Sequence, residues 1–212
     1  LITTSNFVTQ YFLKCANIEA DYLYLFGNIP FSSNLKSNLE RKVLKVAFFG
    51  TLYQSFPYSV LCDFLFSISD LGNIKIEIVL IGNQRLNSKA KNFVTICKIR
   101  GFSVCKTGHL TSNFISHELQ NCDFGVSTTP FDVIGKSGAT AAMLEHGLPV
   151  LTYDDGDNTL ISKNIHLHFD EQIFLINDAS SIEKLFQYLE KPRKSFFDGI
   201  TYTSNRMLEI IS

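Results

Sequence analysis

The stretch Phe131-Asp-Val-Ile-Gly-Lys-Ser-Gly-Ala-Thr-Ala-Ala-Met-Leu-Glu-His-Gly-Leu-Pro-Val150 decides the fold of this chain. It follows a short apolar run at residues 122–126, which is typical of a buried strand. We expect a turn, a short helix of small residues and a second strand over residues 148–153. Ser137 is placed to cap the amino end of that helix. Gly147 suits its carboxyl end, because glycine adopts the left-handed conformation that ends a helix.

The amino end of this expected helix has the features of a phosphate site. Backbone N–H groups from Ser137 to Ala139 would lie free at the positive end of the helix dipole. Gly138 lets a ligand approach the backbone closely, and Lys136 adds a positive charge beside it. Such an arrangement binds phosphate groups. An ordinary strand, turn and helix without a ligand has the same local pattern, so both interpretations stay open.

Spacing and charge exclude other kinds of site. Gly135-Lys136-Ser137 spells the end of a P-loop, but that motif needs a glycine five residues before Gly135, where this chain has Pro130. The formal net charge of −1 gives no basic field for nucleic acid or an anionic membrane. The five cysteines have no CxxC pair and no metal-ligand spacing. We expect them to be reduced, mostly buried thiols in a cytosolic protein; they are Cys15, Cys62, Cys97, Cys105 and Cys122.

The length and the ends of the chain indicate a piece of a larger protein. The 212 residues suit one or two domains. The sequence contains no apolar window of ~18 residues, so we expect no transmembrane helix. The chain begins at Leu1, without a methionine and without a signal-peptide pattern. We therefore expect a fragment that is cut within a fold.

Short apolar runs alternate with helical patterns along most of the chain. Expected strands cover residues 44–49, 74–81, 102–106, 122–127, 148–153 and 173–176. Expected helices cover residues 57–71, 88–100, 112–120 with Ser112 as N-cap, the segment after Ser137, 180–189 and a last helix that contains 207–211. This alternation predicts βαβ units, and hence an α/β fold with a Rossmann-like parallel sheet and helices on both faces.

Glycines follow several of these strands directly. Gly50, Gly82 and Gly108 each come at a strand end, as does the turn from Gly135 to Gly138. Ligands of open parallel sheets bind beyond the carboxyl ends of the strands, where the strand order switches. Any one glycine there makes a turn, but four of them on one edge favour a binding site.

The order of these motifs resembles the carboxy-terminal half of a GT-B glycosyltransferase of group 1, the two-Rossmann-domain architecture that uses nucleotide sugars. The resemblance covers roughly residues 1–189. Each motif is weak alone, and their order and spacing carry the match. The matching segments are Phe48-Phe-Gly-Thr51, Ile78-Val-Leu-Ile-Gly-Asn83, Thr107-Gly-His-Leu110 followed by Ile115-Ser-His-Glu-Leu119, Cys122-Asp-Phe124, and the helix that ends in Gly147-Leu-Pro-Val150.

The resemblance implies a division of the chain into four parts. Residues 1–30 would be the last helix, expected over 5–15, and the last strand, expected over 22–26, of a missing amino-terminal domain. The polar residues 31–42 would be the interdomain linker. Residues 43–192 would form the donor-binding domain, and residues 193–212 a carboxy-terminal helical segment.

The resemblance also implies a set of residues that bind a nucleotide sugar. They are Gly50, Thr51, Gly82, Asn83, Thr107, Gly108, His109, Lys136, Ser137, Gly138, Ala139 and Glu145. Many relatives carry a ribose-binding glutamate where this chain has Ala142, and a partner acid where it has Ile134. Glu145 could substitute for it, although a charged residue on the solvent face of the helix is the simpler interpretation. No catalytic residue and no stereochemical outcome follow from the sequence.

The implied chemistry needs a nucleotide-sugar donor, no cofactor and no metal. The acceptor would be a glycan or a lipid-linked sugar, bound mainly by the missing amino-terminal domain, in the biosynthesis of a cell-surface polysaccharide. The protein would be cytoplasmic, with peripheral membrane association of the whole protein as an option and no role for nucleic acid. A nucleotide-sugar 2-epimerase of the same architecture and a non-catalytic α/β interaction module are the alternatives.

The remaining polar candidates have structural interpretations. Residues 154–158 are acidic, but their spacing does not match a calcium loop, and a solvated turn is the simpler interpretation. His166 and His168 lack an evident third metal ligand. His109 stays a site candidate, whereas His117 and His146 are expected on helix surfaces.

Overall fold

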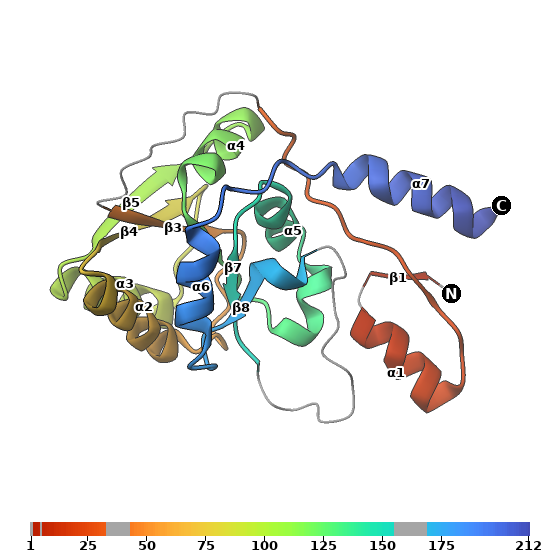
Figure 1. Ribbon diagram of the computed structural model, residues 1–212, viewed down its shortest axis with the longest axis horizontal. Coiled ribbons are helices and arrows are strands. Elements are labelled where there is room, and N and C mark those ends of the chain that lie inside the picture. The colour runs from red at the N-terminus through yellow and green to blue at the C-terminus, as the bar shows by residue number, and fades with distance from the viewer. Residues whose placement is uncertain (1, 5, 33–42, 155–168) are drawn as a thin grey trace.

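The computed structural model describes residues 2–4, 6–32, 43–154 and 169–212. It contains a large sheet domain and a smaller outer body, shown on the right of Figure 1. Most of the expected linker, most of the acidic stretch 154–158, His166 and His168 lie outside the described residues.

The sheet domain is built on six parallel strands. They are β3 (Val43–Phe49), β4 (Lys75–Ile81), β5 (Ser103–Gly108), β6 (Phe124–Val126), β7 (Val150–Thr152) and β8 (Ile173–Leu175). Their order in space is β5-β4-β3-β6-β7-β8, and every neighbouring pair is parallel. The chain therefore reverses its direction across the sheet between β3 and β6. This reversal is the switch point at which α/β folds of this order bind ligands.

Helices cover both faces of the sheet because side chains alternate along each strand. From β3, Leu44, Val46 and Phe48 enter the core beneath one helical layer, whereas Ala47 belongs to the core beneath the other. The first layer consists of α2 (Tyr58–Gly72), α3 (Ser88–Ile99) and α6 (Ser181–Leu189). The second consists of α4 (Ser112–Asn121) and α5 (Gly138–Glu145), preceded by the 3-10 helix η1 (Phe131–Lys136). The predicted α/β fold with a parallel sheet is confirmed.

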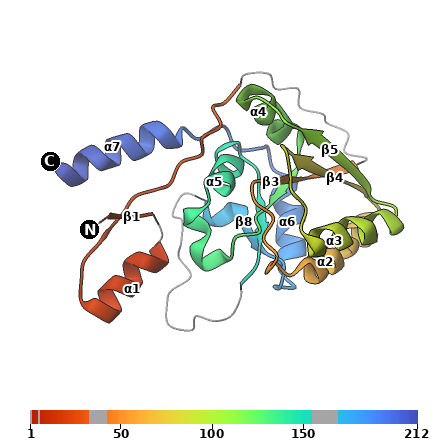
Figure 2. The same ribbon diagram turned by 180° about the vertical axis from the view of Figure 1, so that it is seen from behind.

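The outer body combines the two ends of the chain. Strands β1 (Ile2–Thr3) and β2 (Asp21–Tyr22) pair in parallel and are joined by α1 (Asn6–Ala16). Helix α7 (Gly199–Ile211) lies beside them, as both views in Figures 1 and 2 show. Two stretches of chain connect this body to the sheet domain. We call residues 23–32 the first crossing segment and residues 190–198 the second crossing segment.

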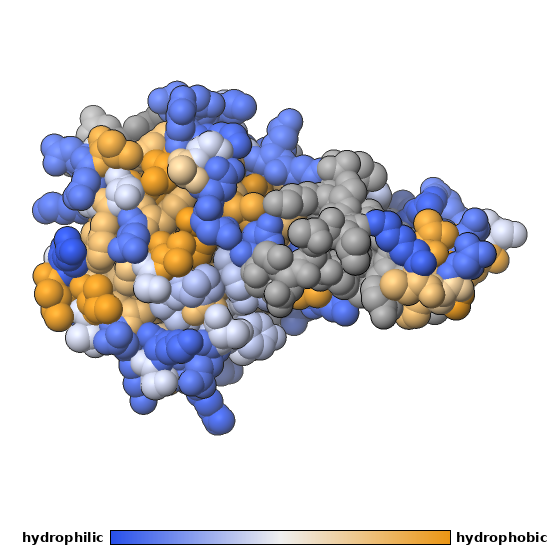
Figure 3. All heavy atoms as spheres, turned by 90° about the horizontal axis from the view of Figure 1, so that it is seen from below, coloured by the Kyte–Doolittle hydropathy of each residue, from blue (hydrophilic) through white to orange (hydrophobic). Residues whose placement is uncertain are grey.

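Apolar side chains of the outer body are exposed. Figure 3 shows apolar and polar side chains side by side at the end of the molecule where this body lies. The large apolar residues exposed on its helices and the turn after α1 are Leu13, Ile18, Ile200, Met207, Leu208 and Ile211. No helix among the described residues is long and apolar enough to span a membrane.

The elements from residue 43 onward agree with the predicted order, and most boundaries shift by only one or two residues. Two predictions at the local level were wrong. Of the strand expected over 22–26, only Tyr22 belongs to β2, because the partner β1 ends at Thr3 and no other strand of the described residues pairs with the chain beyond Leu23. The N-cap of α4 is Thr111, and Ser112 is already its first helical residue.

The half-buried side chain of Arg193 fixes the second helical layer to the second crossing segment. The guanidinium of Arg193 donates to backbone oxygens of Leu119, Gln120, Cys122 and His146, and so satisfies carbonyls at the ends of α4 and α5. One residue of the second crossing segment therefore holds both helix ends in place.

His146 contradicts its expected place on a helix surface. It is 2% exposed, and burial lowers its pKa. Its Nε2 lies 2.9 Å from Ser116 Oγ, which already accepts hydrogen bonds from Ser32 N and Gln120 Nε2. The Ser116 hydroxyl must therefore donate to Nε2, which leaves the proton of the neutral ring on Nδ1, facing the Ala142 carbonyl at 2.7 Å.

His117 and three of the five cysteines lie where they were expected. His117 is exposed, as predicted. All five cysteines are free thiols, and Cys62, Cys97 and Cys122 are buried, whereas Cys15 and Cys105 are exposed.

Candidate ligand-binding site

A pocket of about 230 Å³ lies where β3 and β6 end, at the switch point of the sheet. Three segments form it: the turn after β3, the turn after β6, and the start of α5 with the lysine before it. The residues that line it are Phe49, Gly50, Thr51, Tyr53, Ser127, Thr128, Thr129, Lys136, Ser137, Gly138, Ala139 and Thr140. Six of the twelve residues predicted to bind a nucleotide sugar are therefore gathered in one place.

The amino end of α5 is open toward this pocket. Ser137 caps the helix as predicted, because its Oγ accepts the N–H of Thr140 at 3.2 Å. The N–H of Ser137, which was expected to be free, donates to the carbonyl of Ile134 at 3.0 Å, because Ser137 closes the 3-10 helix η1. The N–H groups of Gly138 and Ala139 have no acceptor among the residues that the structure describes. Free N–H groups at the positive end of a helix attract anions, and Lys136 brings a full positive charge to the same opening.

Hydroxyl groups hold this opening in shape. Thr140 Oγ1 lies 2.7 Å from Ser127 Oγ and donates to Ser137 Oγ at 2.8 Å. Thr128 Oγ1 donates to the carbonyl of Thr51 at 2.6 Å and accepts from Tyr53 N at 3.2 Å, which ties the turn after β6 to the turn after β3. The three lining segments are thus joined by direct hydrogen bonds.

Two glycines shape the pocket in different ways. Gly50 has a φ of 91°, and a Cβ there would stand 2.5 Å from the Ala139 Cβ, so only glycine permits this packing of the first turn on α5. A Cβ at Gly138 would meet nothing within 4 Å, because it would stand in the open pocket. Gly50 is needed by the fold, whereas Gly138 leaves room for a ligand.

The charge of the lining favours an anion. Lys136 is the one charged residue of the twelve, and no carboxylate is among them. Within the described ranges, no three His, Cys, Asp or Glu side chains are placed to hold a metal ion. Tyr53 adds an exposed aromatic ring at the edge, with 48% of its surface accessible.

Five predicted site residues lie at the neighbouring strand ends and do not line this pocket. They are Gly82, Asn83, Thr107, Gly108 and His109. Thr107 Oγ1 accepts the N–H of Gly82 at 2.9 Å, and Gly82 and Gly108 form a bridge with φ values of 87° and 71°. His109 is exposed. These residues continue the same edge of the sheet beyond the pocket, along β4 and β5.

Sequence reasoning missed several lining residues. Ser127, Thr128 and Thr129 follow β6 directly, and a polar triplet at the end of a buried strand is the signal that could have found them. Tyr53 had no such signal, because its place depends on the path of the turn after β3.

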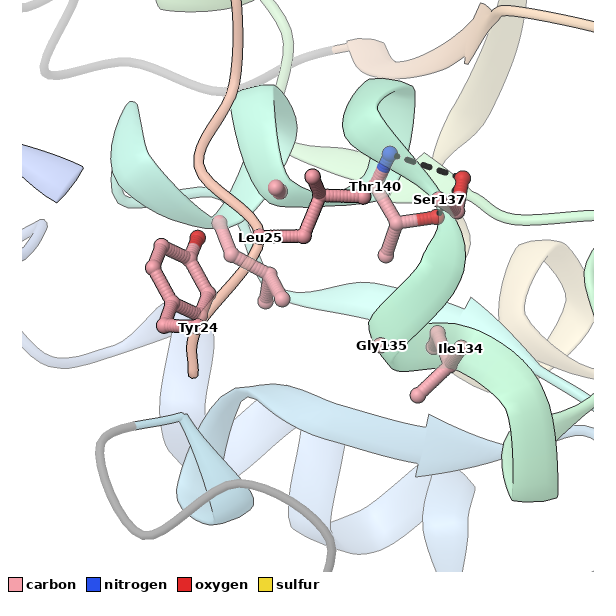
Figure 4. Close-up of a pocket in the computed structure, with 8 residues that line it drawn as sticks. Tyr24, Leu25, Ile134, Gly135, Ser137 and Thr140 are labelled. Atoms are coloured by element: carbon pink, nitrogen blue, oxygen red, sulfur yellow. Dashed lines mark hydrogen bonds between the residues drawn. The ribbon is translucent and has the colours of Figure 1, made fainter. Parts of the chain in front are cut away.

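A second, narrower crevice lies on the other flank of α5. In Figure 4, Tyr24 and Leu25 of the first crossing segment lie against α5 and η1, next to the Ser137–Thr140 hydrogen bond. The crevice holds about 10 Å³, which leaves room for roughly one water molecule and no organic ligand.

Comparison with known proteins identifies the fold of the chain. No family model matches the sequence, and no curated protein matches it either. Solved structures do match. A mutant of S. aureus TarM, solved with fondaparinux, alpha-GlcNAc-glycerol and UDP, aligns with 90% of the chain at 15% identity and a TM-score of 0.53. HepE of Anabaena, solved with UDP and glucose, aligns with 100% at 16% identity and 0.52. The lipopolysaccharide outer core galactosyltransferase WaaB aligns with 97% at 14% identity and 0.52.

The fold is that of a GT-B carboxy-terminal domain. At these identities the likeness concerns the fold alone. The chain spans 36%, 62% and 57% of the three matched proteins.

The two positions at which the resemblance places acidic residues, one in α5 and one in η1, lie inside the protein. Ala142 is 0% exposed and Ile134 is 2% exposed. Gly27 of the first crossing segment packs on α5 there, and a Cβ at Gly27 would stand 2.6 Å from the Ala142 Cα. A glutamate side chain at position 142 would have no room beside this segment.

Glu145 contradicts the expectation of a solvent-facing residue. It is 2% exposed, lies at the opposite end of α5 from the pocket, and does not line it. Its Oε1 accepts the N–H of Gly27 at 2.9 Å. The side chain is therefore used to bind the first crossing segment, because α5 is surrounded by protein at this end.

Proposed function

We propose that this chain is the donor-binding part of a glycosyltransferase and that its pocket holds the diphosphate of a nucleotide sugar. The observation that carries the proposal is the open amino end of α5, where the N–H groups of Gly138 and Ala139 and the ammonium of Lys136 meet at a switch point of the sheet. A diphosphate matches this set because its oxygens accept several hydrogen bonds and carry negative charge.

In the proposed reaction, the same groups stabilise the leaving nucleoside diphosphate. Negative charge grows on the diphosphate as the bond to the sugar breaks, and fixed N–H donors with a nearby cation lower the energy of that state. The pocket offers no carboxylate for a divalent ion, so the protein groups themselves would neutralise the charge. The nucleobase of the donor would lie over the ends of β4 and β5, near residues 107–110, where backbone groups are exposed.

The acceptor belongs to a part of the protein that this chain does not supply. We infer that an amino-terminal domain binds a glycan or lipid-linked sugar and that the outer body continues into it, since apolar side chains of α1 and α7 are exposed. The chain alone would then bind nucleotide without turnover. Polysaccharide biosynthesis, hexosyl transfer, a cytoplasmic location and peripheral membrane association belong to the same proposal.

Calorimetric titration of the folded chain with UDP, GDP and ADP tests the donor site. We expect one of them to bind, and Lys136→Ala to weaken that binding by ~1–3 kcal/mol, or about 10- to 100-fold, the range for hydrogen bonds to charged groups. Lys98→Ala is the matched control, because Lys98 is exposed near the carboxyl end of α3 and does not line the pocket. A folded chain that binds none of the three nucleotides contradicts the proposal.

A further inference from the structure

The carboxyl end of α5 is the meeting point of three segments that are distant in sequence. Glu145 is the last residue of α5, and its backbone carbonyl accepts the N–H of Phe197 in the second crossing segment at 2.9 Å. Its carboxylate accepts the N–H of Gly27 in the first crossing segment at 2.9 Å. Gly199, the first residue of α7, packs directly on the same carboxylate, and a side chain there would overlap Oε1. One residue thus contacts both connections to the outer body.

The packing of α7 strengthens this junction. Thr203 Oγ1 donates to the carbonyl of Tyr24 at 3.0 Å, so α7 is bonded to the first crossing segment. The rings of Tyr24, Phe169, Phe197 and Tyr202 form a continuous aromatic cluster, with centroids 5.3 to 6.4 Å apart. These contacts join α7 to the first crossing segment, whose Tyr24 lies beside Glu145.

The carboxylate of Glu145 has no cation to balance it among the described residues. Two titratable groups face it: Tyr24 of the first crossing segment, and Asp198, the residue directly before α7. His146, next to it on the chain, turns its ring toward Ser116. An ionised carboxylate that is buried with only the Gly27 N–H and the Tyr24 side chain to stabilise it, and with no cation, is costly, whereas the protonated acid is not.

We propose that Glu145 is a pH-sensitive latch that holds the outer body to the sheet domain when protonated and loosens it when ionised. This latch would act whichever ligand the pocket binds. When the crossing segments separate from α5, water reaches the carboxylate, and its preference for the ionised form returns. Each proton lost therefore shifts the balance toward the open arrangement.

The pH range over which the latch loosens follows from the pKa of Glu145. Burial raises the pKa of Glu145 to about 7 from a usual value of 4.5, and the charge of Asp198 raises it further, whereas the Gly27 N–H and Tyr24 act in the opposite direction. Opening is thus least favourable below pH 4.5, increases from there to pH 7 and levels off above. Between pH 6 and pH 8 the open population should increase about 10-fold.

Proton–nitrogen NMR spectra recorded from pH 5 to pH 9 test the latch. The Gly27 amide donates directly to Glu145, so its resonance should shift with a midpoint near 7 in the unaltered chain. Glu145→Gln keeps the acceptor oxygen and should abolish the step. Glu183→Gln, which changes an exposed carboxylate on α6, is the matched control and should leave it unchanged. A Gly27 resonance that is constant over this range in the unaltered chain would overturn the proposal.

Amide exchange measures the loosening itself. After correction for the intrinsic pH dependence of exchange, protection of the Gly27 and Phe197 amides, which donate to Glu145, should fall about 10-fold from pH 6 to pH 8, and stay constant in Glu145→Gln. Asp198→Asn keeps the cap of α7 but removes a negative charge, and should lower the midpoint of the Gly27 step. Equal loss of protection in Glu145→Gln, or an unmoved midpoint in Asp198→Asn, would contradict the assignment to Glu145.

Discussion

The two ends of α5 are built in opposite ways, although the helix is only eight residues long. At the amino end, Gly138 borders open space and the backbone N–H groups face a pocket with one cation. At the carboxyl end, Glu145 is enclosed by both crossing segments and α7. The first end is free to bind an anion, whereas the second already has its partners. A helix end is therefore available to a ligand only where the rest of the chain leaves it uncovered.

The largest effect should come from the charge at the closed end. Glu145→Gln removes a carboxylate whose pKa is raised to about 7 in the folded chain. The folded state binds this proton more tightly than the unfolded state, so its contribution to stability is full below pH 4.5 and is lost as the pH rises through 7. The free energy of unfolding of the variant, relative to that of the unaltered chain, should increase by on the order of 2–3 kcal/mol from pH 5 to pH 8.

Urea unfolding at the two pH values measures this difference in the free energy of unfolding. The comparison of each chain with itself removes the contribution of the other acids. A difference between variant and unaltered chain that does not change with pH would show that Glu145 is already ionised at pH 5.

A side chain at Gly27 should break the closed end by steric overlap. In Gly27→Ala, the new methyl group would lie 2.6 Å from the Cα and 2.7 Å from the N of Ala142, and backbone atoms cannot move aside cheaply. Overpacking of this kind costs ~1–3 kcal/mol, so thermal unfolding should begin at a lower temperature. An unchanged melting temperature would mean that the first crossing segment is not packed on α5.

The cap of the open end should have a smaller effect on stability and a distinct effect on binding. Ser137→Ala removes the acceptor of the Thr140 N–H and should cost about 1 kcal/mol. Asp198→Ala removes the cap of α7, whose Oδ1 accepts the Thr201 N–H at 3.0 Å, at a similar cost. Urea unfolding should show similar losses, and nucleotide titration should show weaker binding for Ser137→Ala alone. Equal losses of nucleotide binding in the two variants would show that the cap at Ser137 has no specific effect on binding.

The smallest effect on stability is expected at Gly138. Because no atom lies within 4 Å of a Cβ at this position, Gly138→Val should change the free energy of unfolding by less than about 0.5 kcal/mol. The same side chain would occupy the pocket and should weaken nucleotide binding about 10-fold or more, as seen by calorimetry. A destabilised variant would mean that the open end is packed after all.

Local sequence patterns predicted much of the fold and half of the candidate site. The apolar runs that became β3 and β4 and the cap at Ser137 were recognisable, because each depends on residues within a few positions of one another. Gly82, Gly108 and His109 were expected in the same binding site as Lys136; they lie at the ends of β4 and β5, outside the lining of the pocket. The order of strand ends along an edge is set by the topology of the whole sheet.

Glu145 and His146 show where local reasoning failed. A charged residue and a histidine at the end of a short helix normally face solvent. Here the helix is buried from Thr140 to Glu145, so it has no solvent face at this end. Gly27 and Ser32, which bond to Glu145 and to the Ser116 partner of His146, come from more than 80 positions earlier in the chain.

The sequence by itself determined the alternation of strands and helices, the capped start of α5 and the glycine turns beside it. These features rest on hydrogen bonds and backbone conformations that a few neighbouring residues establish. Only the tertiary structure decided that one end of α5 is open and the other is closed. Burial depends on which distant segments pack against a surface, and the crossing segments reach Glu145 only after the whole sheet has formed.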